Sequence, residues 1–244
     1  PKINSPTILT NIAKAKEAEG QFKEAESVYE KANNYEAIIR LNLEVLDNFQ
    51  KAKLTFKQKS QTPHCAKMIA EYCSKRGAKK DSIEFLVLAG QRDEAFQIAE
   101  KNEDMDEYAR VILQIDERNI DENMKIAQYF ENKSQWGKAA RHYEKCENYN
   151  KALKYYIEEG ERSISDMIEM VGRVKIDPLT HELVDYLMGE KDGIPKEPQH
   201  TFKLYRAIGN TRQAIKIAIT IANQEQELGN YKYAHEILYE TYKD

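Results

Sequence analysis

The dipeptide Ile-Ala recurs at a fixed interval of 57 residues, and this repeat limits the possible folds more than any other feature of the chain. A small residue follows each alanine after seven positions, and another follows five positions later. The full copies are Ile12-Ala13 with Gly20 and Ala25, Ile69-Ala70 with Gly77 and Ser82, and Ile126-Ala127 with Ser134 and Ala139. A slightly shortened copy runs through Ile221, Ala222, Gly229 and Ala234, and a partial one through Phe202, Gly209 and Ala214. This frame predicts copies of one structural unit stacked in series.

The spacing within the frame indicates two helices joined by a tight turn. The first alanine lets a second helix approach closely, and a glycine at the turn adopts the left-handed conformation that ends a helix. A shorter copy follows each of the first three frames, at Asn33, Gly90 and Glu147, so each 57-residue block holds two hairpins. The frame resembles tetratricopeptide (TPR) repeats. We predict an all-α, right-handed TPR-like solenoid of helical hairpins, with about 12 to 14 helices.

One loop interrupts the repeat. We expect TPR-like repeats with the 57-residue period over residues 1–188, a loop over 189–199 that contains two glycines and two prolines, and further hairpins over 200–244. The last of these is expected to be truncated, because residues 239–244 still show a helical pattern. At the other end, the first residue is Pro1. We therefore expect this sequence to be a piece of a longer protein.

Helix starts are predicted at three positions where a capping residue precedes proline. These are Ser5-Pro6, Thr62-Pro63 and Asp177-Pro178. The side chains of Ser, Thr and Asp accept hydrogen bonds from the first free backbone N–H groups of a helix, and proline lacks an N–H at a position where none is needed.

The composition excludes several classes of protein. Ten glycines and six prolines in 244 residues are too few for an all-β domain or for glycine-rich phosphate loops. Three cysteines cannot form a disulfide framework or paired zinc ligands. The net charge of −4 argues against nucleic-acid binding, and no apolar stretch approaches the length of a membrane span. We expect no cofactor, no direct membrane insertion and no small-molecule substrate.

Two longer stretches carry a narrower resemblance. Residues 181–239 contain the run from Leu187 to Lys196 and the later stretch Gly229-Asn230-Tyr231, and residues 66–99 contain Ala66-Lys67-Met68-Ile69-Ala70. Both are similar to the C-terminal TPR region of the intraflagellar transport protein 144 family. Members of that family carry two β-propellers, a helical solenoid and a zinc-binding end. This chain would correspond to the solenoid alone.

The resemblance implies a scaffold role in intraflagellar transport complex A, in retrograde ciliary transport and in the ciliary entry of membrane proteins. Its implied partners are other subunits of that complex, the WD-repeat and TPR core proteins. The implied location is the cilium or flagellum, including the basal body, on the cytoplasmic side.

The residues do not form a recognisable catalytic, cofactor or metal set. The five histidines lie singly, without the i, i+4 spacing of a helical zinc site. The acidic clusters at 103–107 and 116–122 lack the order of a calcium-binding loop, and we interpret them as solvated faces. Cys65, Cys73 and Cys146 are expected to be structural thiols, and we predict that the chain is not an enzyme.

Opposite charges are segregated along the sequence. Residues 51–80, the basic zone, hold nine Lys or Arg against one acid, and residues 81–123, the acidic zone, hold thirteen acids against four bases. One interpretation is that two solvated faces attract each other; the other is a docking surface for an oppositely charged subunit. The docking candidates are Lys51, Lys53, Lys57, Lys59, Lys75, Arg76, Lys79 and Lys80. Loop residues Asp192, Gly193, Pro195 and Lys196 are candidates for a second contact.

Two alternative functions share this architecture. A TPR adaptor that captures short peptides would need basic and amide side chains on the inner helix face, for which Asn11, Lys14 and Lys67 are the candidates. A scaffold of the vesicle-coat type would show the same repeats, and only the resemblance at residues 181–239 separates it from the ciliary one.

Overall fold

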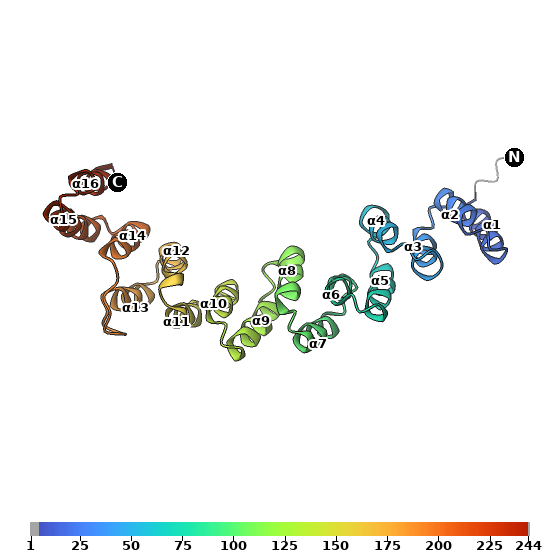
Figure 1. The fold of residues 1–244 in the computed structure, drawn as a ribbon, viewed down its shortest axis with the longest axis horizontal. Coiled ribbons are helices and arrows are strands. Elements are labelled where there is room, and N and C mark those ends of the chain that lie inside the picture. The colour runs from blue at the N-terminus through green and yellow to red at the C-terminus, as the bar shows by residue number, and fades with distance from the viewer. Residues whose placement is uncertain (1–4, 244) are drawn as a thin grey trace. The chain divides into compact units, whose positions relative to one another are not determined.

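The computed structural model describes residues 5–243, which form sixteen α-helices and one short 3-10 helix, with no β-strand in that range (Figure 1). The predicted all-α fold is confirmed. The number of helices exceeds the predicted 12 to 14, because each of the three 57-residue blocks supplies four helices and the remaining residues supply four more. The handedness of the solenoid stays a prediction.

The chain divides into two compact units, Pro1–Glu117 and Arg118–Asp244. In the first unit, each helix packs against the next, and α3 and α6 also contact α5 and α8, respectively. Its helices are α1 (Pro6–Ala18), α2 (Phe22–Lys31), α3 (Tyr35–Glu44), α4 (Phe49–Lys59), α5 (Pro63–Lys75), α6 (Lys79–Leu88), α7 (Arg92–Asn102) and α8 (Met105–Asp116).

The second unit is built from the same hairpins until α13. Its helices are α9 (Ile120–Asn132), α10 (Trp136–Lys145), α11 (Tyr149–Glu159), η1 (Glu161–Ser163), α12 (Ile164–Val174), α13 (Asp177–Leu187), α14 (Pro198–Ile208), α15 (Thr211–Glu227) and α16 (Tyr231–Lys243). The segment between α13 and α14 covers residues 188–197, close to the predicted loop.

The small residues of the frame lie where the two helices of a hairpin meet. Eight of them are at most 2% exposed: Ala13, Ala25, Ala70, Ser82, Ala127, Ala139, Ala222 and Ala234. Because a methyl or hydroxymethyl group takes little space, the two backbones can approach closely and pack in register.

The turn residues adopt the left-handed conformation that the frame predicts. Gly20, Gly77 and Gly229 have φ between 73° and 81°, and Ser134 has φ of 55°. In the first turn, the amide of Gln21 donates to the carbonyl of Lys16 at 2.9 Å, the bond of a Schellman cap, and the same bond recurs in the other three turns. The frame therefore fixes both the approach of the helices and the turn between them.

The predicted helix starts are only partly correct. Thr62 caps α5, because its hydroxyl accepts from the amide of Cys65 at 3.3 Å. Ser5 is the N-cap of α1 without such a bond, and Asp177 is the first residue of α13 rather than its cap, which is Ile176. Five asparagines supply side-chain caps that the frame does not reveal: Asn34, Asn48, Asn119, Asn148 and Asn210.

The regular order of packing changes at α12, which packs directly on α14. A Cβ atom built on Gly172 of α12 would lie 2.6 Å from the Cβ of Ala207 on α14, closer than two carbons can approach. Glycine is therefore required at this crossing. The contact joins two helices that are not consecutive, and α13 and the 188–197 loop lie between them in the sequence.

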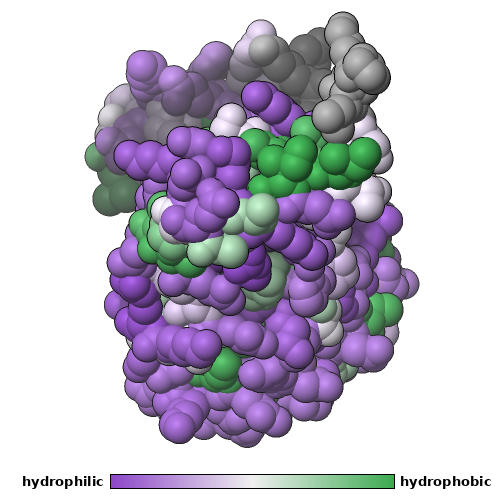
Figure 2. All heavy atoms as spheres, turned by 90° about the vertical axis from the view of Figure 1, so that its right-hand side faces the viewer, coloured by the Kyte–Doolittle hydropathy of each residue, from purple (hydrophilic) through white to green (hydrophobic). Residues whose placement is uncertain are grey.

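Hydrophilic side chains cover most of the face shown in Figure 2, with hydrophobic patches between them. On α1, Ile8 and Ile12 are 46% and 38% exposed, whereas Ile69, which matches Ile12 in the frame, is buried. The difference follows from packing, because α5 contacts α3, α4 and α6, and α1 packs mainly on α2. None of the described helices is both long enough and apolar enough to cross a lipid bilayer.

Candidate docking surface

The basic zone folds onto three consecutive helices of the first unit. Lys51, Lys53, Lys57 and Lys59 lie on α4, Lys75 and Arg76 at the end of α5, and Lys79 and Lys80 at the start of α6. The structure divides these eight candidates into a paired group and an unpaired group, four in each.

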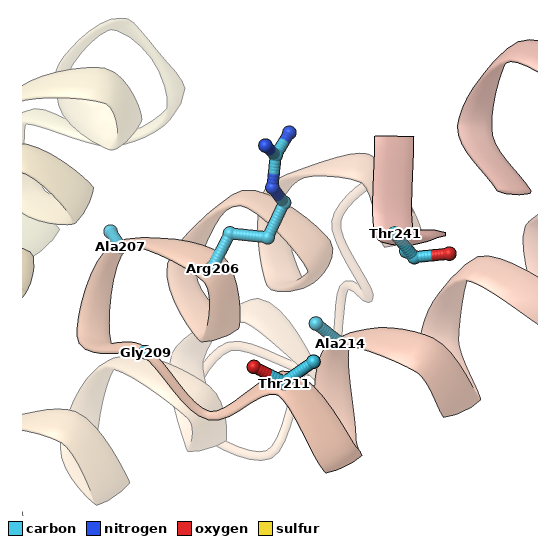
Figure 3. A pocket seen from close by; sticks show the side chains of 6 residues that line it. All are labelled: Arg206, Ala207, Gly209, Thr211, Ala214 and Thr241. Carbon is cyan, nitrogen blue, oxygen red and sulfur yellow. The ribbon is translucent and has the colours of Figure 1, made fainter. Parts of the chain in front are cut away.

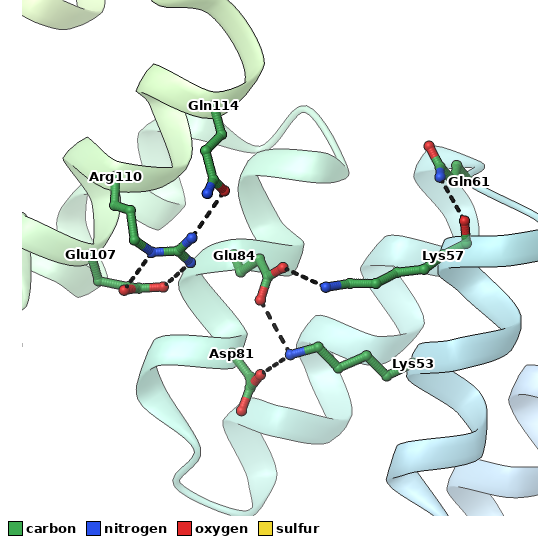
Figure 4. A network of polar contacts seen from close by, with 8 residues as sticks. All are labelled: Lys53, Lys57, Gln61, Asp81, Glu84, Glu107, Arg110 and Gln114. Carbon is green, nitrogen blue, oxygen red and sulfur yellow. Dashed lines mark hydrogen bonds and ion pairs between the residues drawn. The ribbon is translucent and has the colours of Figure 1, made fainter.

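Lys53 and Lys57 face the first acids of the acidic zone (Figure 4). The Nζ atom of Lys53 lies 2.6 Å from Oδ1 of Asp81 and 3.3 Å from Oε2 of Glu84, and Nζ of Lys57 lies 3.6 Å from Oε1 of Glu84. Burial of the Lys53 amine opposes its charging, but the two carboxylates outweigh this effect and raise its pKa. The pairs join α4 to α6, so the two zones attract each other inside the first unit.

Lys51 and Arg76 are also paired. The Nζ atom of Lys51 lies 2.5 Å from Oε2 of Glu26 on α2. The guanidinium of Arg76 pairs with Asp47 and lies over the ring of Tyr72, 4.8 Å from its centroid. These contacts connect consecutive hairpins, and four of the eight candidates thus have a role within the chain.

Lys59, Lys75, Lys79 and Lys80 are exposed, and no ion pair holds them within residues 5–243. Lys75 lies at the edge of a cavity of about 340 Å³ between α3 and α5, which Leu43, Met68 and Tyr72 also line. These four lysines are the docking candidates whose charge no ion pair within the described residues neutralises.

The four candidates in the predicted loop also fall into two groups, three exposed residues and one residue with a buried side chain. Asp192, Gly193 and Pro195 are exposed, whereas the Lys196 side chain is only 5% exposed. Its Nζ lies 2.7 Å from Oδ2 of Asp192 and 5.1 Å from the ring centroid of Tyr186. Lys196 therefore anchors the loop from inside and lowers the pKa of Asp192, while the apex carries Ile194, which is 59% exposed.

One histidine and two cysteines occupy buried structural positions. The ring of His142 is buried against Phe130, and its Nδ1 lies 2.8 Å from Oδ1 of Asn123. Burial raises the pKa of Cys73 to about 12, so its thiol is protonated at neutral pH. Cys65 is also buried. No group of three or more His, Cys, Asp or Glu residues that could hold a metal ion occurs among the described residues.

Several cavities lie at the end of the second unit. The one drawn in Figure 3 has a volume of about 450 Å³ and lies between α14, α15 and α16. Its only charged lining residue, Arg206, is paired with Glu240 at 2.8 Å, and the rest of the lining is small or hydroxylated: Ala207, Gly209, Thr211, Ala214 and Thr241. This cavity offers no available charge to orient a ligand.

A second cavity is larger, about 690 Å³, and lies between α13, α14 and the start of α15. It brings together Lys175, His181 and Arg212, which are all exposed. No signal in the sequence marks this group, because its members lie six and thirty-one residues apart and outside any charge run.

Stacked helical hairpins with small residues at the crossings define a TPR-like repeat protein. The chain belongs to the TPR domain family of the intraflagellar transport proteins 140 and 172, whose sequence model matches residues 2–193. It is 38% identical to WD repeat-containing protein 19 of Mus musculus and of Homo sapiens, in alignments of 248 residues that cover all of this chain. It is 31% identical over 243 residues to WD repeat-containing protein dyf-2 of Caenorhabditis elegans, which covers 99% of this chain.

The chain spans 18% of the first two relatives and 17% of the third, less than a fifth of their length. WD repeat-containing protein 19 is intraflagellar transport protein 144, so the resemblance predicted from the sequence is confirmed.

Proposed function

We propose that this chain is a non-enzymatic scaffold segment of intraflagellar transport complex A. The observation that carries the proposal is the 38% identity to WD repeat-containing protein 19 along the whole chain. The segment would mediate contacts between subunits for retrograde ciliary transport and for the ciliary entry of membrane proteins. Its partners would be other WD-repeat and TPR core subunits, in the cilium or flagellum including the basal body, on the cytoplasmic side.

The hairpin stack supports this proposal in physical terms. Within each unit, hairpins bury apolar side chains against neighbouring helices, so the packed helices themselves present surfaces with many possible contact points. Exposed rim charges such as Lys59, Lys79 and Lys80 would steer an acidic partner and set the register of docking. Lys53 contributes to the stability of the first unit instead.

The test is cross-linking mass spectrometry on the assembled complex, followed by charge reversal. We expect lysines of this chain to cross-link to other subunits, and Lys59→Glu with Lys79→Glu and Lys80→Glu to reduce subunit retention at physiological salt. Lys154→Glu with Lys203→Glu is the control for charge, since both residues are exposed in the second unit.

The two parts of the proposal fail separately. Unchanged retention of the triple variant would overturn the docking surface and leave the scaffold role intact. An assembled complex that forms equally well without this segment would overturn the scaffold role itself.

The residues predicted for the peptide-adaptor alternative give it little support. Asn11 and Lys14 lie on α1 and Lys67 lies on α5, and α1 packs mainly on α2 rather than on α5. The candidates therefore do not line one groove. The vesicle-coat alternative has the same architecture, and no particular residue of the structure favours it.

A further inference from the structure

The larger cavity of the second unit is a groove with a basic rim and an apolar floor. We name it the α13–α15 groove, after the helices that line it. One face of α13 supplies Asp177, Thr180, His181 and Val184, which follow the spacing of a helical stripe. Tyr205 and Ile208 of α14 and residues 210–213 at the start of α15 form the other wall. Its volume of about 690 Å³ is typical of ligand-binding clefts.

The rim carries an uncompensated positive charge. Lys175 and Arg212 line the groove, and neither has an ion-pair partner among residues 5–243. Asp177 is the one acid in the lining. Lys53 and Arg206 are paired with carboxylates on neighbouring helices, whereas Lys175 and Arg212 have no such partner to neutralise them. Such an arrangement favours an anionic occupant.

The start of α15 acts in the same direction. Among the first residues of α15, the amide of Gln213 is capped by Asn210, and the amides of Thr211 and Arg212 have no intrahelical acceptor. These N–H groups add partial positive charge to the wall.

The groove also offers apolar surface beside its charged residues. Val184, Tyr205 and Ile208 are half-buried and present apolar surface between the charged rims. A free inorganic anion would leave this surface uncovered, whereas a side chain such as leucine would bury it and remove it from water.

We propose that the α13–α15 groove binds a short acidic segment of a partner protein, in which an apolar side chain lies between carboxylates. The carboxylates would pair with Lys175 and Arg212, and the apolar side chain would lie on Val184 and Ile208. This site goes beyond the scaffold role, because it captures a linear segment instead of another helical surface.

The experiment measures binding of a short fluorescein-labelled peptide, in which each leucine is flanked by glutamates, to the 244-residue chain by fluorescence anisotropy. Lys175→Glu with Arg212→Glu should weaken binding by about tenfold or more, and raising the salt concentration should weaken wild-type binding. Lys203→Glu is the matched control, since this exposed lysine of α14 lies outside the groove, and it should change binding by less than about twofold.

Altered peptides test whether binding requires both the carboxylates and the apolar side chain. Replacement of the glutamates by glutamine, or of the leucines by alanine, should each reduce affinity. Equal binding by the doubly reversed variant, or equal affinity for the glutamine peptide, would overturn the proposal. Full competition by inorganic phosphate would show a small-anion site and would also overturn it. Thermal unfolding of each variant excludes loss of fold as the cause.

Discussion

The hairpins α5/α6 and α9/α10 occupy the same place in the repeat, 57 residues apart, yet different side-chain contacts hold their helices together. Both have the small residues of the frame at the crossing. In α9/α10, the buried Tyr143 hydroxyl donates a hydrogen bond to Glu131. The matching residues in α5/α6 are Leu86, which is buried, and Ser74, which is exposed. We call the position of Tyr143 and Leu86 the bracing position.

This comparison separates what the repeat requires from what it tolerates. The crossing and the turn are fixed by size and by backbone conformation, which few residues can satisfy. The bracing position needs only a buried side chain that fills the space, and a leucine or a hydrogen-bonded tyrosine does so. The hairpin α1/α2 also has a hydrogen-bonded tyrosine at this position, since the Tyr29 hydroxyl donates to Glu17 at 2.9 Å.

The crossing residues should be the most sensitive to change in both hairpins. Ala70→Arg and Ala127→Arg would force a long charged side chain between packed helices and should each lower the free energy of unfolding by about 3–5 kcal/mol. Chemical denaturation measures the loss. Glu71→Arg and Gln128→Arg, at the exposed neighbouring positions, are the controls. Unchanged stability of Ala127→Arg would show that the assigned register is wrong.

The α12/α14 crossing should behave like the frame although it lies outside it. Gly172→Ala should cost about 1–3 kcal/mol, because its Cβ would meet the Cβ of Ala207 at 2.6 Å. Combination with Ala207→Gly should restore part of this loss, so the two changes should be non-additive in a double-mutant cycle. Additive effects would argue against direct contact.

The bracing position should distinguish the two hairpins through pH. Burial of Glu131 opposes its ionisation, but hydrogen bonds from Tyr143 and Tyr155 outweigh this and lower its pKa. Glu131 therefore contributes stability above the ordinary glutamate pKa, and this contribution is lost as the pH falls through its lowered folded-state pKa.

Tyr143→Phe should cost about 1 kcal/mol at pH 7, and the difference from wild type should shrink below about pH 4. Unfolding measured across this pH range tests the expectation. Leu86→Val in α5/α6 should destabilise by a similar amount at every pH, because no ionisable group is involved. A pH-independent effect of Tyr143→Phe would contradict the hydrogen-bonded role.

The turn position should give effects of at most about 1 kcal/mol, with opposite signs in the two hairpins. Ser134→Gly should stabilise by about 0.5 kcal/mol, because φ of 55° strains a residue with a Cβ. Gly77→Ala should destabilise by about 1 kcal/mol for the same reason. Ser134→Ala, which keeps the strain, should not stabilise, and thermal unfolding distinguishes the three variants.

The fold could be predicted from the sequence wherever its cause is local. The left-handed turns and the hairpin crossings depend on residues within about 15 positions of one another, so a single frame reveals them. The Gly172–Ala207 contact joins residues 35 positions apart across an interruption of the repeat, and no spacing in the sequence indicates it.

The candidate surface shows the same limit. Segregation of charge into two zones was visible in the sequence, but whether Lys53 reaches Glu84 or solvent depends on how α4 lies on α6. The two cations of the α13–α15 groove, Lys175 and Arg212, come from separate segments and become neighbours only through packing.

The buried anchor of the 188–197 loop has a consequence for proteolysis. Trypsin must draw a lysine side chain and several flanking residues into its active-site cleft, and exposed loop tips are the usual sites of cleavage. Lys196 is held beneath the loop, and its amide donates to the carbonyl of Leu187 at 2.9 Å, whereas the Lys191 side chain is 37% exposed. A brief digestion should therefore cut this loop after Lys191 and spare the bond after Lys196 until the second unit unfolds.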